Sequence, residues 1–253
     1  MTTAAPKKET RPEQYLEPVS IIAARCVDII ETGSKDRPPQ QKDMKQQHRI
    51  SGLYAVTPDE ADTGRLAAKV RDALSGGVKF VQYRNKIADA ALRLEQARVL
   101  CKLCRQHDAR LIINDHLDLA LETGADGLHL GGEDGSIAAA RGRLGPHKII
   151  GASCYNVLQS ALQAEREGTD YVAFGSFFAS GVKPGAVHAP LDLLREAKQR
   201  LSVPVVAIGG ITHANAPQLI AAGADSVAVI SALFAAPDVK FAARQFNAFF
   251  DKP

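Results

Sequence analysis

The stretch that decides the fold is PVVAIGGITHANAPQLIAAGADSVAVIS, residues 204–231. It begins with a β-branched run at 204–210, continues with a segment of helical period at 214–221 and ends with a second β-branched run at 226–231. Gly223 stands between the helical segment and the second run, where a helix C-cap needs a positive φ. This order of strand, helix and strand predicts a βαβ unit with parallel strands.

The same pattern recurs outside this unit. Three further turns, GGVKFVQ, TGADGLH and EGTDYVAFG, also place a glycine before a strand. Eight strands are predicted in all, at 52–57, 78–84, 110–115, 127–130, 149–154, 171–175, 204–210 and 226–231. Helical periods accompany them, at 63–74, 88–107, 156–167, 190–200, 214–221 and 238–249. Eight parallel strands predict an α/β fold, the (β/α)8 TIM barrel, whose closure removes both sheet edges. A doubly wound open sheet is the alternative.

Residues 1–50 differ in composition from the rest of the chain. They hold five of the 13 prolines and a glutamine-rich run at 40–47, and only 19–30 could form an amphipathic helix. Such a segment cannot bury enough apolar surface to offset its loss of conformational entropy. We therefore expect two parts, a mostly disordered N-terminal extension at 1–50 and a barrel at 51–253.

Composition narrows the functional classes. The chain has 253 residues, is 45% hydrophobic and 23% charged, and carries a formal net charge of +3. It contains neither a run of about 20 apolar residues nor a signal peptide, so we expect a cytoplasmic protein that does not cross a membrane. It also lacks Trp and any basic cluster interleaved with aromatic residues, which disfavours nucleic-acid binding. We expect small-molecule substrates instead, and a homo-oligomer stays open.

Charged and polar residues finish the predicted strands. In a (β/α)8 barrel the active site lies at the C-terminal ends of the strands, so these residues are the candidates for chemistry. They are Gln82, Arg84, Lys86, Asn114, Asp115, His129, Asp134, Ser153 and Lys183.

Two of these candidates, Asp115 and Asp134, come from neighbouring strands beside Arg84 and Lys86. Two carboxylates suit Mg²⁺, which keeps several waters and takes other ligands from a phosphate. Arg and Lys bind phosphate oxygens. This combination predicts a magnesium-dependent diphosphate site, and separate salt bridges from the carboxylates to Arg84 and Lys86 are the alternative.

A second anion site is predicted after the last two strands. Gly209 and Gly210 follow the seventh strand, and Ile230 and Ser231 close the eighth. Backbone N–H groups can approach an anion there, as in the phosphate sites common at this place in the fold. A pair of turn glycines without a ligand is the alternative.

Six motifs carry a resemblance to a known family. In order they are QYRNK at 82–86, IINDHLDLAL at 112–121, GADGLHLGGED at 124–134, YVAFGSFFASGVKP at 171–184, AIGGI at 207–211 and AVIS at 228–231. With these motifs, each near a predicted strand end, the chain resembles the thiamine phosphate synthase family from Gly52 to about Phe250.

The resemblance implies a transferase of thiamine biosynthesis. It would join 4-amino-2-methyl-5-(diphosphooxymethyl)pyrimidine to 4-methyl-5-(2-phosphooxyethyl)thiazole and release diphosphate. The implied pyrimidine diphosphate contacts are Gln82, Tyr83, Arg84, Asn85, Lys86, Asn114, Ser153 and Lys183. The implied thiazole phosphate contacts are Ser180, Gly181, Val182, Gly210, Ile230 and Ser231. Mg²⁺ would be held by Asp115 and Asp134, and the implied catalytic side chains are Lys183 and Ser153.

The chain departs from the family pattern in one loop. Val182 stands where the family usually has Thr, and Ala179 where it usually has Pro. Two alternatives stay open: a thiazole tautomerase-like enzyme of the same fold, which predicts degraded carboxylates, and a catalytically silent barrel that binds thiazole phosphate, which Val182 and the N-terminal extension favour. His129 is interpreted as a polar residue that fills the barrel mouth, with a direct catalytic part as the alternative.

Overall fold

A computed structural model describes residues 50–132, 134–179 and 189–251. The predicted N-terminal extension, apart from Ile50, lies outside the described residues. The strands are β1 (Gly52–Val56), β2 (Phe80–Tyr83), β3 (Arg110–Asn114), β4 (Gly127–Leu130), β5 (Ile149–Tyr155), β6 (Tyr171–Phe174), β7 (Val205–Ile208) and β8 (Ser226–Val229). The helices are α2 (Thr63–Ser75), α3 (Ala90–Gln106), α4 (Leu117–Thr123), α5 (Ile137–Leu144), α6 (Leu158–Arg166), α7 (Leu191–Arg200), α8 (Ala216–Ala221), α9 (Ser231–Phe234) and α10 (Val239–Asn247).

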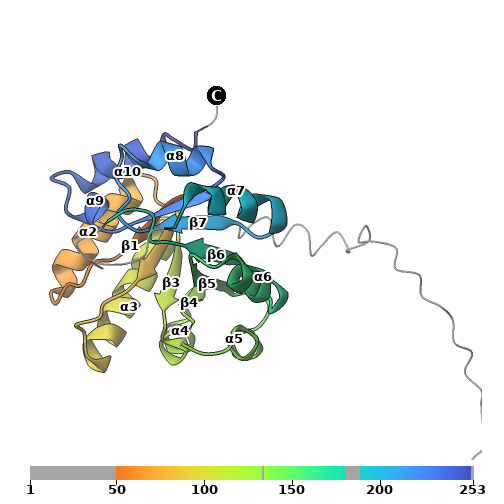
Figure 1. Cartoon of the computed structure of the whole chain (residues 1–253). Helices are drawn as coiled ribbons and strands as arrows, with labels where there is room; N and C mark the ends of the chain where they lie inside the picture. Colours follow the sequence, from red (N-terminus) through yellow and green to blue (C-terminus); the bar gives the residue numbers. More distant parts are fainter. Residues whose placement is uncertain (1–49, 133, 180–188, 252–253) are drawn as a thin grey trace, which may run out of the picture. The chain divides into compact units, whose positions relative to one another are not determined.

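The eight strands form one closed parallel barrel, with the helices around it (Figure 1). Each strand pairs with the next along the chain, and β8 returns to pair with β1, for example Ala228 opposite Tyr54. The predicted (β/α)8 barrel is therefore confirmed. The doubly wound open sheet is wrong, because such a sheet leaves two strands with an unpaired edge.

Local sequence signals explain where the helices begin and end. Asp62, Asp89, Ser136 and Asp238 each cap a helix by accepting a hydrogen bond from a backbone N–H of its first turn. The glycines of the four repeated turns, Gly77, Gly124, Gly168 and Gly223, all have positive φ angles. Because a side chain at such a position would be strained, these glycines allow each helix to stop before the next strand.

The core has two layers, which follow from the alternation of side chains along each strand. One set fills the barrel interior and includes Tyr54, Phe80, Ile112 and Tyr171. The other set packs between the barrel wall and the helices. Polar residues in step with the interior set, near the C-terminal end of a strand, therefore point into the barrel mouth.

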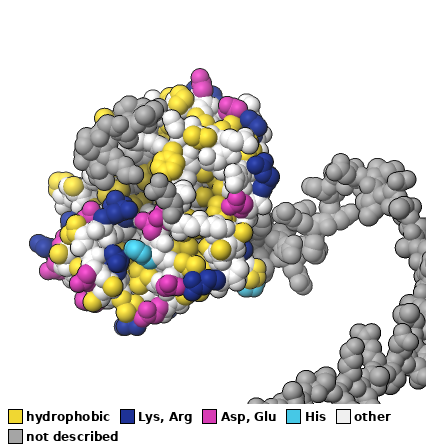
Figure 2. Space-filling model, turned by 60° about the horizontal axis from the view of Figure 1, so that its bottom comes forward, with side chains coloured by type: hydrophobic (Ala, Val, Ile, Leu, Met, Phe, Trp, Pro, Cys, Tyr) yellow, Lys and Arg dark blue, Asp and Glu magenta, His cyan; other side chains and the backbone are white. Residues whose placement is uncertain are grey.

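The helices and the visible surface show two further features. No helix among the described residues is long and apolar enough to cross a membrane. On the face shown in Figure 2, acidic and basic side chains are interleaved rather than gathered into one basic patch. Charge on this face is therefore mixed rather than concentrated.

Candidate active site

A cavity lies at the C-terminal ends of β2 and β3, where the sequence predicts the diphosphate site. Its lining residues are Tyr83, Arg84, Asn85, Lys86, Arg93, Asn114, Asp115, His116 and Asp134. Seven of these nine are among the predicted site residues. Arg93 and His116 are not. His116 lies two residues after β3, a position that could have identified it, whereas Arg93 lies in the first turn of α3, where no local signal marks it.

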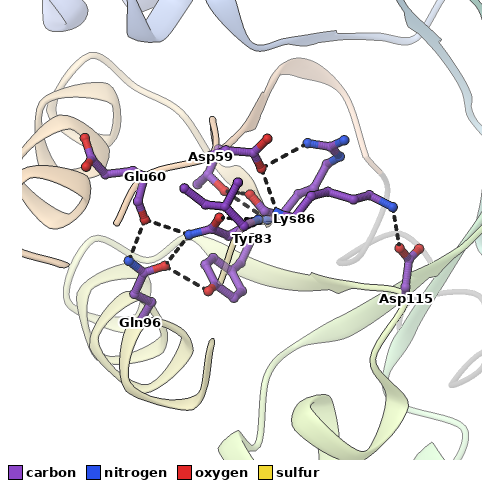
Figure 3. A network of polar contacts seen from close by, with 10 residues as sticks. Asp59, Glu60, Tyr83, Lys86, Gln96 and Asp115 are labelled. Atoms are coloured by element: carbon purple, nitrogen blue, oxygen red, sulfur yellow. Dashed lines mark hydrogen bonds and ion pairs between the residues drawn. The ribbon is translucent and has the colours of Figure 1, made fainter. Parts of the chain in front are cut away.

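The loop after β2 is fixed to the loop after β1. Thr57 Oγ1 accepts a hydrogen bond from Arg84 N at 2.9 Å and donates one to Arg84 O at 2.8 Å. Asp59 Oδ1 accepts from Lys86 N at 2.7 Å and lies 3.4 Å from Arg84 Nη1. These contacts, drawn in Figure 3, hold the backbone that carries Arg84 and Lys86 at the cavity.

A fully buried glutamine of α3 supports the same loop. Gln96 Oε1 accepts hydrogen bonds from the Tyr83 hydroxyl and from Asn85 Nδ2, both at 2.9 Å. Gln96 Nε2 donates to Glu60 O at 2.9 Å, and Asn85 Nδ2 donates to the same carbonyl at 2.6 Å (Figure 3). Tyr83 and Asn85 line the cavity, but their side-chain hydrogen bonds are made to Gln96 and to the Glu60 carbonyl. Gln96 was not predictable from the sequence, because a single glutamine on a helix gives no signal of burial.

The two predicted metal-binding carboxylates lie side by side. Asp115 follows β3 with a positive φ of 62°, and its N–H donates to His129 O at 2.9 Å. Asp134 Oδ2 accepts from Gly131 N at 2.8 Å. Burial, and then the neighbouring Asp134 carboxyl group, raise the pKa of Asp115. A cation bound between the two carboxylates would relieve their mutual repulsion and stabilise their charged forms.

The cations around these carboxylates are only partly paired with them. Lys86 Nζ lies 3.4 Å from Asp115 Oδ2, while its side chain remains 58% exposed. Arg84 pairs with Asp59 rather than with Asp115 or Asp134. The alternative was a separate salt bridge from each carboxylate to Arg84 or Lys86. The structure shows one of them, between Lys86 and Asp115. Both cations border the cavity, where an anion could bind.

The adjoining carboxylates are a donor set that suits Mg²⁺. Zinc sites usually need at least three protein ligands, whereas Mg²⁺ is commonly held by one or two carboxylates together with waters and substrate phosphates. Asp115 and Asp134 supply that pair of carboxylates.

Ser153 and His129 lie on the interior of the barrel mouth. Ser153 Oγ is 2.8 Å from His129 Nε2, and His129 Nδ1 is 2.9 Å from the Tyr171 hydroxyl. Burial lowers the pKa of His129 to about 4, so the imidazole is neutral at pH 7. The interpretation of His129 as a polar residue that fills the mouth agrees with this burial. Its bond to Ser153 also links it to a predicted catalytic side chain.

The described part of the predicted thiazole phosphate site lies at the same end of the barrel. Gly210 follows β7 with a positive φ, and a Cβ added there would lie 2.4 Å from Ala179 O. This glycine therefore lets the loops after β6 and β7 approach closely. Ile230 and Ser231 follow β8, where Ser231 begins α9. The remaining predicted contacts, Ser180, Gly181, Val182 and Lys183, lie outside the described residues.

The closed barrel and its cavity define a (β/α)8-barrel enzyme with a polar site at the C-terminal ends of its strands. The family model described as thiamine monophosphate synthase matches residues 53–233. The chain belongs to this family.

Similar proteins agree with this assignment. Thiamine-phosphate synthase of Nitrosospira multiformis is 55% identical over 203 residues, which cover 80% of this chain and 87% of that relative. Thiamine-phosphate synthase of Nitrosomonas eutropha is 54% identical over 202 residues, covering 80% and 95%. Among solved structures, thiamine phosphate pyrophosphorylase from Pyrococcus furiosus is 37% identical and superposes with a TM-score of 0.70, covering 81% of this chain and 96% of that one. The chain is thus an enzyme of thiamine phosphate synthesis, as the resemblance implied.

Proposed function

We propose that this chain condenses 4-amino-2-methyl-5-(diphosphooxymethyl)pyrimidine with 4-methyl-5-(2-phosphooxyethyl)thiazole in a magnesium-dependent reaction, and that the cavity at β2 and β3 binds the diphosphate. One observation carries the proposal of a metal-diphosphate site: the Asp115 and Asp134 carboxylates adjoin each other in a cavity that Arg84 and Lys86 also line. A thiazole tautomerase needs no such site, so this observation favours the synthase.

The residues divide the work between the leaving group and the pyrimidine. Arg84 can hold diphosphate oxygens through its planar guanidinium, and Lys86 adds a point charge. Gln82 and Asn114 point into the barrel mouth, where their amide groups can bind the pyrimidine ring. Mg²⁺ bound by Asp115 and Asp134 would neutralise negative charge on the diphosphate.

The bond changes need no nucleophilic side chain. The bond from the pyrimidinylmethyl carbon to the diphosphate oxygen breaks, and both electrons leave with the diphosphate. The thiazole nitrogen then donates its electron pair to that carbon. Positive side chains aimed at the leaving group lower the barrier, because negative charge develops there. As part of the proposal, Lys183 contacts the same diphosphate, and Ser180, Gly181, Val182, Gly210, Ile230 and Ser231 hold the thiazole phosphate.

A cytoplasmic location belongs to the same proposal. Cys101, Cys104 and Cys154 are buried free thiols, which suit a reducing compartment. Whether the barrel forms a homo-oligomer is best answered by light scattering of the purified chain.

The metal site is tested by removing its charges singly. Asp115→Asn or Asp134→Asn should lower the rate of coupling by about 10²- to 10³-fold, the usual cost of one preorganised electrostatic group. Neither change should unfold the protein, since both side chains lie at strand ends. Asp192→Asn, an exposed residue in the first turn of α7, is the matched control. If either site variant couples within about threefold of the parent, on that scale, the metal assignment is wrong.

A further inference from the structure

Five polar side chains from five strands form one hydrogen-bonded chain through the barrel interior. Gln82 Nε2 is 3.1 Å from the Tyr54 hydroxyl, which is 2.8 Å from the Tyr171 hydroxyl. Tyr171 is 2.9 Å from His129 Nδ1, and His129 Nε2 is 2.8 Å from Ser153 Oγ. Four of these five side chains are buried, namely Gln82, Tyr54, Tyr171 and His129. Ser153, the last of the five, is partly exposed.

The three middle side chains are Tyr54, Tyr171 and His129. Each has one proton to donate, so the direction of one hydrogen bond fixes the direction of the next. The Gln82 amide N–H donates to the Tyr54 oxygen, which leaves the Tyr54 proton for Tyr171. The Tyr171 proton then points at His129 Nδ1.

The direction continues through the imidazole ring. A neutral imidazole that accepts at Nδ1 carries its proton on Nε2 and donates it to Ser153 Oγ. Ser153 thus accepts from inside the barrel, and its own hydroxyl proton is left for a group in the mouth. Burial raises the pKa of Tyr54 and Tyr171, so both phenols keep the protons that this order requires.

We propose that Gln82, Tyr54, Tyr171, His129 and Ser153 form a directional hydrogen-bond relay, in which the two tyrosines and the histidine are positioning residues that make the Ser153 hydroxyl a donor to the substrate. The relay holds His129 in the Nε2–H tautomer. The acceptor is an electron-rich oxygen or nitrogen of the pyrimidine diphosphate, and this last link rests on the proposed function. No proton leaves any group of the relay during the reaction.

The barrel provides a fitted space for the central member of the relay. A Cβ added to Gly151 of β5 would lie 2.0 Å from Tyr171 Cζ and 2.3 Å from its hydroxyl oxygen. The Tyr171 ring also packs edge-on against Tyr54 and stacks on His129, with centroid distances of 5.8 and 5.5 Å. A ring held on three sides has its hydroxyl fixed between its two partners, as a relay requires.

The first test reads the tautomer directly. In the full-length protein with ¹⁵N-labelled histidine, and without substrate, His129 should show a protonated Nε2 and an unprotonated Nδ1. The His129→Asn variant identifies its signals. Tyr171→Phe should move the Nδ1 signal, because that nitrogen loses its donor. A protonated Nδ1 in the parent protein would show that the relay runs in the opposite direction and overturn the proposal, whether or not the enzyme couples its substrates.

The second test measures whether the relay acts through Ser153. Tyr171→Phe should lower kcat about tenfold, the upper range for one neutral hydrogen bond, with KM for the pyrimidine diphosphate within about threefold. In a Ser153→Ala background the same change should have little further effect, since the group it positions is gone. Ser226→Ala removes a buried hydroxyl that donates to Gly52 O at the other end of the barrel, and it should leave kcat unchanged.

Other results of this second test would contradict the relay. If Tyr171→Phe lowers kcat equally with and without the Ser153 hydroxyl, Tyr171 does not act through Ser153 and the relay is overturned. An unchanged kcat in the single variant contradicts the proposal as well. If the Tyr171→Phe variant does not fold, the His129 tautomer in the parent protein still tests the proposal. Failure of the proposed function appears separately, as a parent protein that forms no thiamine phosphate.

Discussion

Gly131 stands directly against the carboxylate of Asp134. Its N–H donates to Asp134 Oδ2 at 2.8 Å, and a Cβ added to it would lie 2.6 Å from the same oxygen. The next residue, Gly132, has room, since its added Cβ would meet only Tyr155 Cε2, at 3.7 Å. At the scale of single residues, the absence of a side chain at Gly131 thus sets where the carboxylate proposed to bind the metal can lie.

This contrast gives a prediction for metal affinity. Gly131→Ala should displace Asp134 Oδ2 and raise the Mg²⁺ concentration for half-maximal activity about tenfold, since a hydrogen bond to a charged group contributes about 1.5 kcal/mol or more. Gly132→Ala is the matched control and should leave that concentration within about twofold, a difference of less than 0.5 kcal/mol. A Mg²⁺ titration of initial rates measures both. Equal effects of the two changes would show that Asp134 does not hold the metal.

His129 gives a prediction for stability against pH. Its folded-state pKa of about 4 lies below its ordinary value of 6.5, so at intermediate pH the unfolded chain binds a proton that the folded protein does not. The contribution of His129 is therefore fully present above about pH 6.5 and is lost as the pH falls towards 4, a change of about 3 kcal/mol. Denaturant unfolding at pH 7, 6 and 5 measures it. His129→Asn should flatten this part of the pH dependence, and an identical slope in both proteins would refute the assignment.

Whether a site residue could be predicted from the sequence depends on whether its residue type distinguishes it from ordinary core residues. Asp115 and Asp134 follow strand ends and carry charge, so strand position and residue type together identified them as candidates. Tyr54 and Tyr171 have the hydropathy of ordinary core aromatics. Their hydroxyls join the relay only because closure of the barrel places β1 and β6 around one interior. No local sequence pattern predicts a contact between residues so far apart in the chain.

At the scale of elements, helix α3 does more than cover the barrel. It begins after the Asp89 cap and presents Gln96, which is fully buried, to the loop after β2. The three hydrogen-bonding partners of Gln96 are Tyr83, Asn85 and the carbonyl of Glu60. One helix side chain thereby connects the loop after β1 to the loop after β2, and the loop after β2 lines the cavity.

Loss of this link should weaken both the fold and the site. Gln96→Met keeps the volume of the side chain but leaves buried polar partners unsatisfied, and we expect it to lower the free energy of unfolding by about 3 kcal/mol. KM for the pyrimidine diphosphate should rise at the same time. Gln106→Met, at the exposed end of the same helix, is the control and should change neither quantity. A Gln96→Met protein with the parent's stability would show that this network is not needed.

Elements were predictable where their signals are local. The β-branched runs and the glycines with positive φ marked every strand and four of the helix ends, because both signals lie within a few residues. Helices α4, α5 and α9 were not among the predicted helical segments. Each has eight residues or fewer, and short helices give a weak helical period, although α8 with its six residues was predicted.

At the scale of the whole molecule, closure of the barrel converts eight separate strand ends into one mouth. Arg84 and Lys86 follow β2, Asp115 follows β3, Asp134 follows β4, and Ser153 lies on β5. These residues are far apart in sequence, and each strand alone would carry one or two unremarkable polar groups. The fold was predictable from repetition, and the grouping of carboxylates and cations from their positions at strand ends. The individual contacts were not: the structure pairs Lys86 with Asp115, but Arg84 with Asp59.

The measurement that tests the central claim most directly is a coupling assay with the purified full-length chain. The two substrates are mixed with the protein, with Mg²⁺ or with excess chelator, and thiamine phosphate and released diphosphate are quantified. We predict equal amounts of both products over many turnovers with Mg²⁺, and a rate at least about 10²-fold lower with chelator, as for loss of a major electrostatic contribution. Absence of thiamine phosphate with Mg²⁺ present, or an equal rate after chelation, would contradict the account.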